Sequence, residues 1–153
     1  MNITFNCQTE QNWINLGSKL ENLLDQETIH FLKTRPWWNQ DHDQLQEILV
    51  ELVPDTHLVA APDDNVNEMF DEFLLRLADE NVILKKMKTS LCHDNSKKLL
   101  CKRKIKEMHT GYALSSDRRW RYHSWGIDSE DRIVETTVPR LIYISGMVYK
   151  LIN

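Results

Sequence analysis

The chain has 153 residues, of which 41% are hydrophobic and 27% charged, and these fractions are typical of a folded globular protein. That length suits one domain over residues 1–153, large enough to bury its own core without disulfides or structural metals. The formal net charge of −4 argues against non-specific binding to nucleic acid, which is driven by excess positive charge.

Signals for targeting and oxidation are few. The first thirty residues contain no basic segment followed by a continuous apolar stretch, so neither a Sec signal peptide nor a membrane span is expected. The three cysteines, Cys7, Cys92 and Cys101, are odd in number and widely spaced, which is not the pattern of a disulfide framework. We therefore expect a reducing, cytoplasmic location, with export by a route other than Sec left open.

The first half of the chain is expected to be helical. Apolar residues recur at spacings of three, four and seven over residues 10–33 and again over 41–53, which is the pattern of amphipathic helices. Residues 56–64 indicate a loop, and a further helix is predicted from about Val66 to Ala78. The short segment 82–84 fits either a helix end or a buried strand. Residues 1–84 are thus expected to form a helical layer.

The second half is expected to contain one helix and then a sheet. A helix is predicted from Cys92 to about Lys106, and from Met108 the apolar pattern changes from helical to alternating. Short turns separate the strands, which favours antiparallel pairing of successive strands. The expected architecture is α+β, with the helix that carries Cys92 packed on a small antiparallel sheet. The strands are predicted over about 108–115, 119–127, 132–138 and 141–149.

Cys92 is the candidate nucleophile because it stands at the start of a predicted helix, with Thr89 or Ser90 available as N-cap. The unpaired N–H groups at a helix N-terminus favour an anion, so a thiolate there has a lowered pKa, and the same groups can hold an oxyanion. A cysteine can equally serve as a small apolar core residue. Cys101 and Cys7 do not share this position at a helix start.

His123 is the candidate base and Glu135 the candidate residue that orients it. Alternation along the strand puts His123 and Trp125 on one face, so the indole can wall the imidazole. Glu135 is a carboxylate in an otherwise β-branched strand, where a charge is costly unless it is paired. If the two strands pair, Glu135 is expected to bind Nδ1 of His123 while the other nitrogen faces Cys92. A sheet histidine and an exposed edge glutamate are the ordinary structural alternatives.

These residues resemble a known family. A cysteine at a helix start, then His-x-Trp on a strand, then an acidic residue followed by Thr on the next strand, is similar to the papain-like fold in its transglutaminase-like branch. The matching segments are Cys92-His93, His123-Ser124-Trp125 and Glu135-Thr136-Thr137, where that branch has Cys-Trp, His-x-Trp and Asp-Pro-Thr. The likeness covers about residues 85–149, and parts of it also resemble a group of uncharacterised bacterial proteins.

The resemblance implies a papain-like cysteine hydrolase or transferase with a triad of Cys92, His123 and Glu135. Trp125, His93 and Asn95 are the accompanying candidates for substrate-binding or wall residues. The expected function is cysteine-dependent acyl transfer (protease, amidase, deamidase or transglutaminase-like) on a protein, peptide or amide substrate. We expect no cofactor, no metal, no nucleic acid and no membrane. The substrate, the oligomeric state and the choice between water and an amine as acceptor are left open.

Two other interpretations compete with catalysis. A non-catalytic α+β protein-interaction module is the main alternative, with Trp37-Trp38 as its contact surface. A zinc site is the other, but no C-x-x-C or H-x-x-x-H spacing brings its candidate ligands together. Those ligands would be Cys92, His93, Cys101, His109 and His123.

Overall fold

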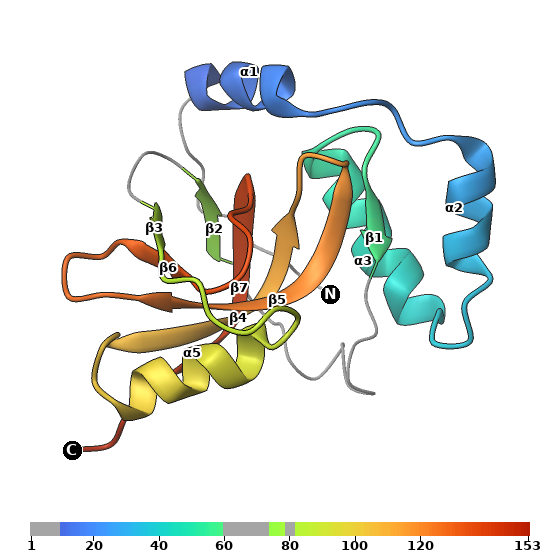
Figure 1. The fold of residues 1–153 in the computed structure, drawn as a ribbon. Helices are drawn as coiled ribbons and strands as arrows, with labels where there is room; N and C mark the ends of the chain where they lie inside the picture. Colours follow the sequence, from blue (N-terminus) through green and yellow to red (C-terminus); the bar gives the residue numbers. More distant parts are fainter. Residues whose placement is uncertain (1–9, 60–73, 79–81) are drawn as a thin grey trace.

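The computed structural model describes residues 10–59, 74–78 and 82–153, which form a mixed α+β fold as expected (Figure 1). Four helices lie in this part: α1 (Glu10–Lys19), α2 (Gln26–Lys33), α3 (Gln40–Leu52) and α5 (Cys92–Cys101). The strands are β1 (His57–Val59), β2 (Leu74–Leu77), β3 (Val82–Leu84), β4 (Glu107–Leu114), β5 (Arg119–Ile127), β6 (Ile133–Glu135) and β7 (Ile142–Tyr149).

The strands join in one curled sheet. Its path runs β2-β7-β4-β5-β6-β3, and β1 pairs with the start of β5. The expected antiparallel pairing of successive strands is confirmed for β4 with β5 and for β5 with β6. The last strand, β7, returns to pair antiparallel with β4 and β2, while β3 lies parallel to β6.

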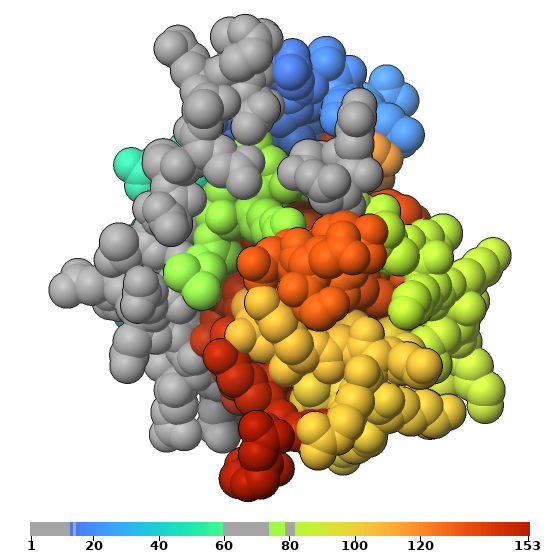
Figure 2. All heavy atoms as spheres, turned by 90° about the vertical axis from the view of Figure 1, so that its left-hand side faces the viewer, coloured from blue at the N-terminus to red at the C-terminus, as the bar shows by residue number. Residues whose placement is uncertain are grey.

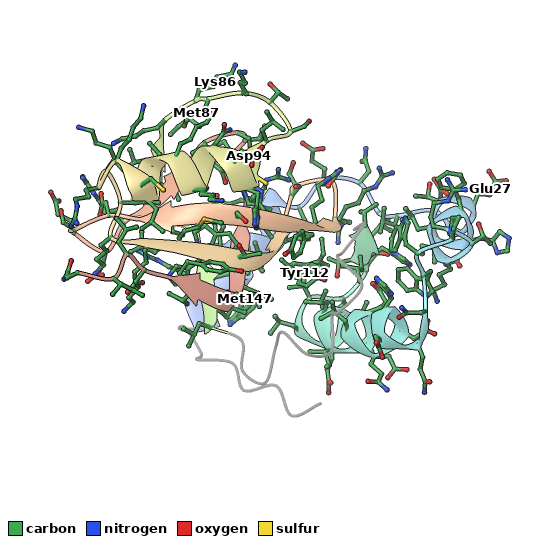
Figure 3. The ribbon with its side chains drawn as sticks, turned by 90° about the horizontal axis from the view of Figure 1, so that it is seen from below. Glu27, Lys86, Met87, Asp94, Tyr112 and Met147 are labelled. Atoms are coloured by element: carbon green, nitrogen blue, oxygen red, sulfur yellow. The ribbon has the colours of Figure 1, made fainter. Side chains whose placement is uncertain are left out.

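Helix α5 covers one face of this sheet. It contacts β5 and β4, and its residues Leu99 and Leu100 are buried against them. Figure 3 shows α5 with Asp94 on one side of the sheet and Met147 on the other. The helix is therefore held in a fixed position on the sheet, and so is its first residue.

The N-terminal helices are tied to the sheet through the largest core cluster. Helix α3 starts at Asn39, whose side chain accepts from the first-turn N–H groups, and it packs beside β1. The buried apolar residues of α3 belong to one cluster with residues from the start of β5, the end of β4 and the start of β7. Fully buried members of this cluster are Leu45, Leu49, Leu58, Tyr112, Leu114, Trp120, Ile142 and Ile144.

The expectation of a helical layer over residues 1–84 is not confirmed, because this half contains strands as well as helices. Residues 74–77, expected in a helix, form β2, while 66–73 lie outside the described residues. Residues 57–59, expected in a loop, form β1, and 82–84 form β3. Leu75 and Leu77 suit helical spacing, but pairing with β7 buries both side chains and favours the strand.

Two helix bounds also differ from expectation. The segment 10–33 forms two helices, because Asp25 begins a new one by accepting a hydrogen bond from the Thr28 N–H at 2.7 Å. Helix α5 ends at Cys101 and not near Lys106. Arg103 takes a positive φ of 54°, and the N–H groups of Arg103 and Lys104 donate to Leu100 and Leu99, which closes the last turn.

The segment after α5 lies beside the β5–β6 hairpin. Figure 2 shows these two segments, in gold and orange, on one face of the molecule with the C-terminal residues in red below them. Lys106 forms an ion pair with Asp131 across this contact. The C-terminal end of α5 is thus attached to the hairpin that leads to Glu135.

Strand β5 has an open interval on the edge that faces away from β4. On that edge β5 pairs with β1 at residues 119–121 and with β6 at residues 126–127. Residues 122–125 have no strand partner there within the part of the chain that is described. His123 lies in this interval, so a group from another element can approach it from the side of the sheet.

Candidate active site

Cys92 is the first residue of α5 and its thiol is partly exposed. The N-cap is Leu91, not Thr89 or Ser90 as predicted, and the Leu91 side chain makes no hydrogen bond to the helix. Ser90 instead has a positive φ of 61°, at the turn that leads into the helix. Because the N-cap side chain cannot accept, it leaves the first-turn N–H groups for another acceptor.

The Cys92 thiol reaches the open interval of β5. It makes hydrogen bonds there with the His123 ring and with the backbone N–H of Ser124. Burial raises the pKa of the Cys92 thiol, but the hydrogen bond and charge of His123, with the Ser124 N–H, hold the pKa below its ordinary value. The Cys92 thiol therefore ionises more readily than an ordinary cysteine.

The pKa of His123 shifts in the opposite direction to that of Cys92. Burial lowers the pKa of its imidazole, but the hydrogen bonds with Cys92 and Glu135 and the charge of Glu135 raise the pKa above its ordinary value. A lowered thiol pKa beside a raised imidazole pKa favours a thiolate–imidazolium pair.

Glu135 holds the other end of the His123 ring. The Nε2 atom of His123 lies 2.8 Å from Oε2 of Glu135, and the two side chains are 2% and 0% exposed. The bond uses Nε2 and not the predicted Nδ1, which leaves Nδ1 for the sulfur. Strand β6 pairs with β5 at Gly126 and Ile127, so Glu135 reaches His123 diagonally across the two strands.

Both oxygens of Glu135 accept several hydrogen bonds. Oε1 accepts from the backbone N–H groups of Thr136 and Thr137 and from the Thr137 hydroxyl, at 2.9, 3.0 and 3.1 Å. Oε2 accepts from His123 and from the Tyr143 hydroxyl, the latter at 2.9 Å. Burial raises the pKa of Glu135, but these bonds and the His123 charge outweigh it and lower the pKa. Glu135 is thus a buried carboxylate with its charge compensated.

Aromatic rings enclose His123, as the alternation of β5 predicts for Trp125. The His123 and Trp125 rings are stacked with centroids 6.0 Å apart and planes at 24°. Tyr143 meets the Trp125 ring edge-on at 5.0 Å and lies 6.3 Å from the His123 ring. The imidazole is therefore shielded from water except toward Cys92.

Sequence reasoning missed Tyr143, although a signal for it exists. Its hydroxyl donates to Glu135 and accepts from the backbone N–H of Arg140 at 2.9 Å. Tyr143 stands between two isoleucines, and a buried tyrosine hydroxyl needs a polar partner, so its position indicated one. The partner could not be named because β7 and β6 are not adjacent in the sheet.

The two remaining site candidates, His93 and Asn95, have different surroundings. His93 is exposed, and its Nδ1 lies 2.6 Å from the hydroxyl of Ser124, which also bonds Thr110 at 2.8 Å. His93 therefore stands at the rim beside Cys92. Asn95 is 1% exposed and donates to the Lys88 carbonyl at 2.8 Å, so its side chain faces the segment before the helix.

Trp37 and Trp38, the contact surface of the interaction-module alternative, are half-buried. Their rings lie 5.7 Å apart and pack on His42, and Nε1 of Trp38 donates to Asp43 at 2.9 Å. Both tryptophans thus take part in packing at the start of α3.

Two further observations concern the function classes considered above. Within residues 10–59, 74–78 and 82–153, no three His, Cys, Asp or Glu side chains are grouped as metal ligands. None of the helices in these residues has the length and apolar composition needed to span a bilayer. No family model, curated protein or solved structure matches the chain.

Proposed function

We propose that the chain is a cysteine-dependent acyl-transfer enzyme in which Cys92 is the nucleophile, His123 the base and Glu135 the residue that orients the base. One observation carries this proposal: the His123 ring contacts the Cys92 thiol and also Oε2 of Glu135, which lies 2.8 Å from Nε2. A histidine needed only for the sheet would be satisfied by Glu135 alone. The additional contact with the Cys92 thiol is the arrangement that a base needs in order to activate a nucleophile.

The proposed reaction proceeds in two steps. His123 takes the thiol proton on Nδ1, and the Cys92 sulfur attacks the carbonyl carbon of an ester or amide. When the tetrahedral intermediate collapses, the bond to the leaving group breaks and the leaving group receives the proton from His123. The thioester on Cys92 is then attacked by water or by an amine, which gives up its proton to His123. The acyl group leaves and the thiol is restored.

The start of α5 supports a place for the oxyanion. The first-turn N–H groups of the helix receive no hydrogen bond from the side chain of Leu91. They carry partial positive charge, which suits the negative charge that develops on a carbonyl oxygen attacked by Cys92. We therefore propose that the backbone N–H of Cys92, with its neighbours in the first turn, stabilises the developing negative charge.

The arrangement of elements supports a papain-like assignment for this half of the chain. A helix that begins with the nucleophile packs on antiparallel strands that carry the base and the acid. The site opens on the partly exposed Cys92 and the exposed His93, while His123 and Glu135 are buried. Such a site suits an amide at the surface of a protein or peptide, with no cofactor.

Acylation by p-nitrophenyl acetate tests the proposal without a known substrate. The wild-type chain is expected to release p-nitrophenol and to carry one acetyl group on the peptide that contains Cys92, found by mass spectrometry. Cys92→Ala and His123→Ala should each lose nearly all of this reaction, while Glu135→Gln should retain part of it because only the orientation of the base is weakened.

Matched controls separate the site from general surface reactivity. Cys101→Ala removes an exposed thiol and His30→Ala an exposed imidazole, and both variants should react like the wild type. Acetylation of Cys101 in preference to Cys92, or full activity in His123→Ala that retains its fold, would show that the proposal is wrong.

A further inference from the structure

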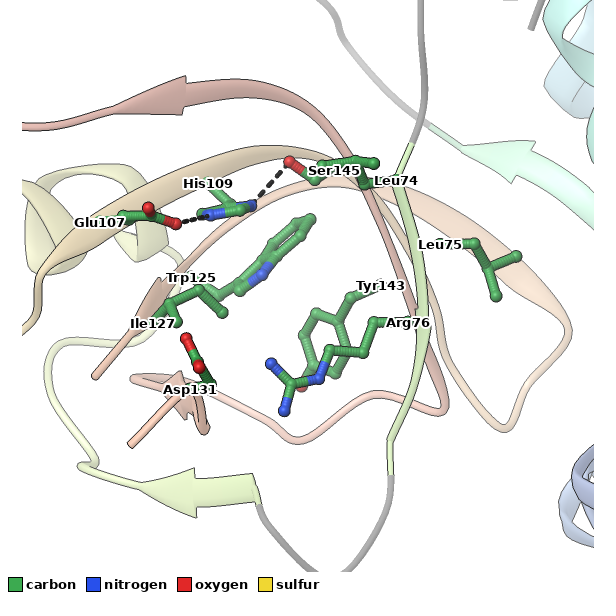
Figure 4. A pocket seen from close by; sticks show the side chains of 10 residues that line it. All are labelled: Leu74, Leu75, Arg76, Glu107, His109, Trp125, Ile127, Asp131, Tyr143 and Ser145. Atoms are coloured by element: carbon green, nitrogen blue, oxygen red, sulfur yellow. Dashed lines mark hydrogen bonds and ion pairs between the residues drawn. The ribbon is translucent and has the colours of Figure 1, made fainter. Parts of the chain in front are cut away.

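A pocket of about 450 Å³ opens on the concave side of the sheet, and neither Cys92 nor His123 lines it (Figure 4). Its lining comes from β2, β4, β5 and β7 and from Asp131 in the turn between β5 and β6, with Trp125 and Tyr143 at the back. These two rings also pack on His123, so the pocket lies on the far side of the aromatic wall from the candidate active site. A volume of this size is ordinary for a small-molecule site.

The charges that line the pocket do not cancel. Glu107 is paired with Lys150 at 2.8 Å and with His109 at 2.9 Å, and Asp131 is paired with Lys106. Arg76 has neither an ion pair nor a hydrogen bond among the described residues. Figure 4 shows its guanidinium extending past Tyr143 into the pocket. The arginine is thus the one charge of the lining that lacks a compensating partner in the described chain.

His109 adds no second charge. Burial lowers the pKa of its imidazole below the ordinary value, and the nearby charge of Arg76 acts in the same direction, against the opposing effect of Glu107. The imidazole is therefore neutral near pH 7. Among the described residues that line the pocket, Arg76 is the one positive charge, and the carboxylates of Glu107 and Asp131 are paired with lysines.

The donors and acceptors in the hydrogen bonds among Glu107, His109 and Ser145 can be assigned. The carboxylate of Glu107 accepts from Nε2 of His109, so Nδ1 carries no proton and accepts from the Ser145 hydroxyl at 2.7 Å. The register between β4 and β7 shifts between Thr110 and Gly111, which pair with Met147 and Ser145, so Ser145 lies directly beside a β-bulge, a feature that commonly re-aims side chains. The Ser145 hydroxyl therefore offers only its oxygen lone pairs to a ligand. The pocket thus has a hydrogen-bond acceptor at Ser145 and a positive charge at Arg76.

We infer that this pocket binds a small organic carboxylate with an apolar body. The guanidinium of Arg76 would hold the carboxylate, and the Trp125 and Tyr143 rings would cover the apolar part. A phosphate monoester suits the pocket less well, because it carries about two negative charges near pH 7 and Arg76 supplies one positive charge. The inference does not depend on the chemistry proposed for Cys92.

Titration with simple aromatic carboxylates tests the inference. The ¹⁵N-labelled chain is titrated with benzoate, phenylacetate, 3-phenylpropionate and 4-phenylbutyrate, and with the four corresponding amides, while the assigned indole N–H signal of Trp125 is followed. At least one acid should give a saturable shift of this signal. Its amide should bind at least about tenfold more weakly, since the charge-assisted hydrogen bonds to Arg76 are lost.

Binding to substituted chains tests whether the acids bind at Arg76. Arg76→Gln should weaken the best acid by at least about tenfold, whereas Arg35→Gln removes a positive charge near Phe31, far from the pocket, and should leave binding unchanged. Cys92→Ala should bind like the wild type, which separates this inference from the proposed function. The absence of saturable binding for all four acids, equal binding of acid and amide, or unchanged binding in folded Arg76→Gln would each overturn the inference.

Discussion

Tyr143 donates its hydroxyl proton to Oε2 of Glu135 at 2.9 Å, the same oxygen that accepts from Nε2 of His123 at 2.8 Å. One carboxylate oxygen therefore fixes two rings, and the Tyr143 ring also lines the pocket on the other side of Trp125. This shared oxygen links the packing of the sheet to the position of the candidate base.

Tyr143→Phe should weaken both the fold and the site. The ring remains, but Glu135 loses a donor and the Arg140 N–H loses its acceptor, so the free energy of unfolding is expected to fall by about 1–3 kcal/mol. Urea denaturation measures the loss. Tyr149→Phe is the matched control, because Tyr149 is exposed and its hydroxyl donates to the Met147 sulfur within the described chain, so the change should alter stability little.

Glu135→Gln should destabilise the fold and make the free energy of unfolding depend less on pH in the acid range. The amide group cannot accept as both carboxylate oxygens do, so we expect a loss of about 2–4 kcal/mol at neutral pH. In the wild type the pKa of Glu135 is lowered in the folded state, against the raising effect of burial, so its charge contributes stability above the unfolded pKa. That contribution is lost as the pH falls through the folded pKa.

Denaturation at a series of pH values down to the acid range checks the Glu135→Gln prediction. The free energy of unfolding of the wild type should decrease more steeply with falling pH than that of the variant. Parallel curves for the two proteins would mean that Glu135 is not the buried anion that its hydrogen bonds indicate.

The sequence predicted the local features of the site better than its long-range contacts. Strand β5 was predicted with its observed bounds, because alternation and the flanking turns are local signals, and the shared face of His123 and Trp125 follows from it. Strands β1 and β2 were missed because each pairs with a strand far along the chain, and for the same reason the pattern of residues 82–84 fits either a helix end or the strand that they form. The use of Nε2 by Glu135 depends on register, and the contribution of Tyr143 depends on the return of β7 to β4, so neither could be predicted.

Gly111→Ala should destabilise the fold strongly because β4 and β7 approach each other closely at the bulge. A Cβ at Gly111 would lie 1.8 Å from the Ile144 carbonyl oxygen, which is backbone and cannot rotate away. We expect a loss of about 3 kcal/mol or more in the free energy of unfolding. Gly17→Ala is the control, since nothing lies within 4 Å of a Cβ there and alanine should stabilise α1 by about 0.5–1 kcal/mol. Equal effects of the two changes in thermal or urea unfolding would contradict the close approach.

The pH dependence of Cys92 alkylation should report its partnership with His123. Alkylation by iodoacetamide requires the thiolate, so its rate rises as the pH passes through the pKa of the thiol. Burial raises the pKa of Cys92, but the His123 contact outweighs it, so the wild-type midpoint should lie below the ordinary value of 9.0. In His123→Ala the burial remains and the hydrogen bond is lost, so the midpoint should move up.

The pH profile of acyl transfer should show a fall in rate at high pH that the pH profile of alkylation lacks. Departure of the leaving group needs the proton on His123, whose pKa is raised in the folded state by Cys92 and Glu135 in spite of burial. Activity should therefore fall as the pH rises through that raised pKa, while alkylation stays at its plateau. The two midpoints belong to the coupled pair and not to either residue alone.

Peptide-resolved mass spectrometry follows alkylation of Cys92, with Cys101 in the same sample as the reference thiol. A wild-type midpoint that His123→Ala leaves unmoved would show that the imidazole does not act on the sulfur, and would remove the basis for assigning His123 as the base.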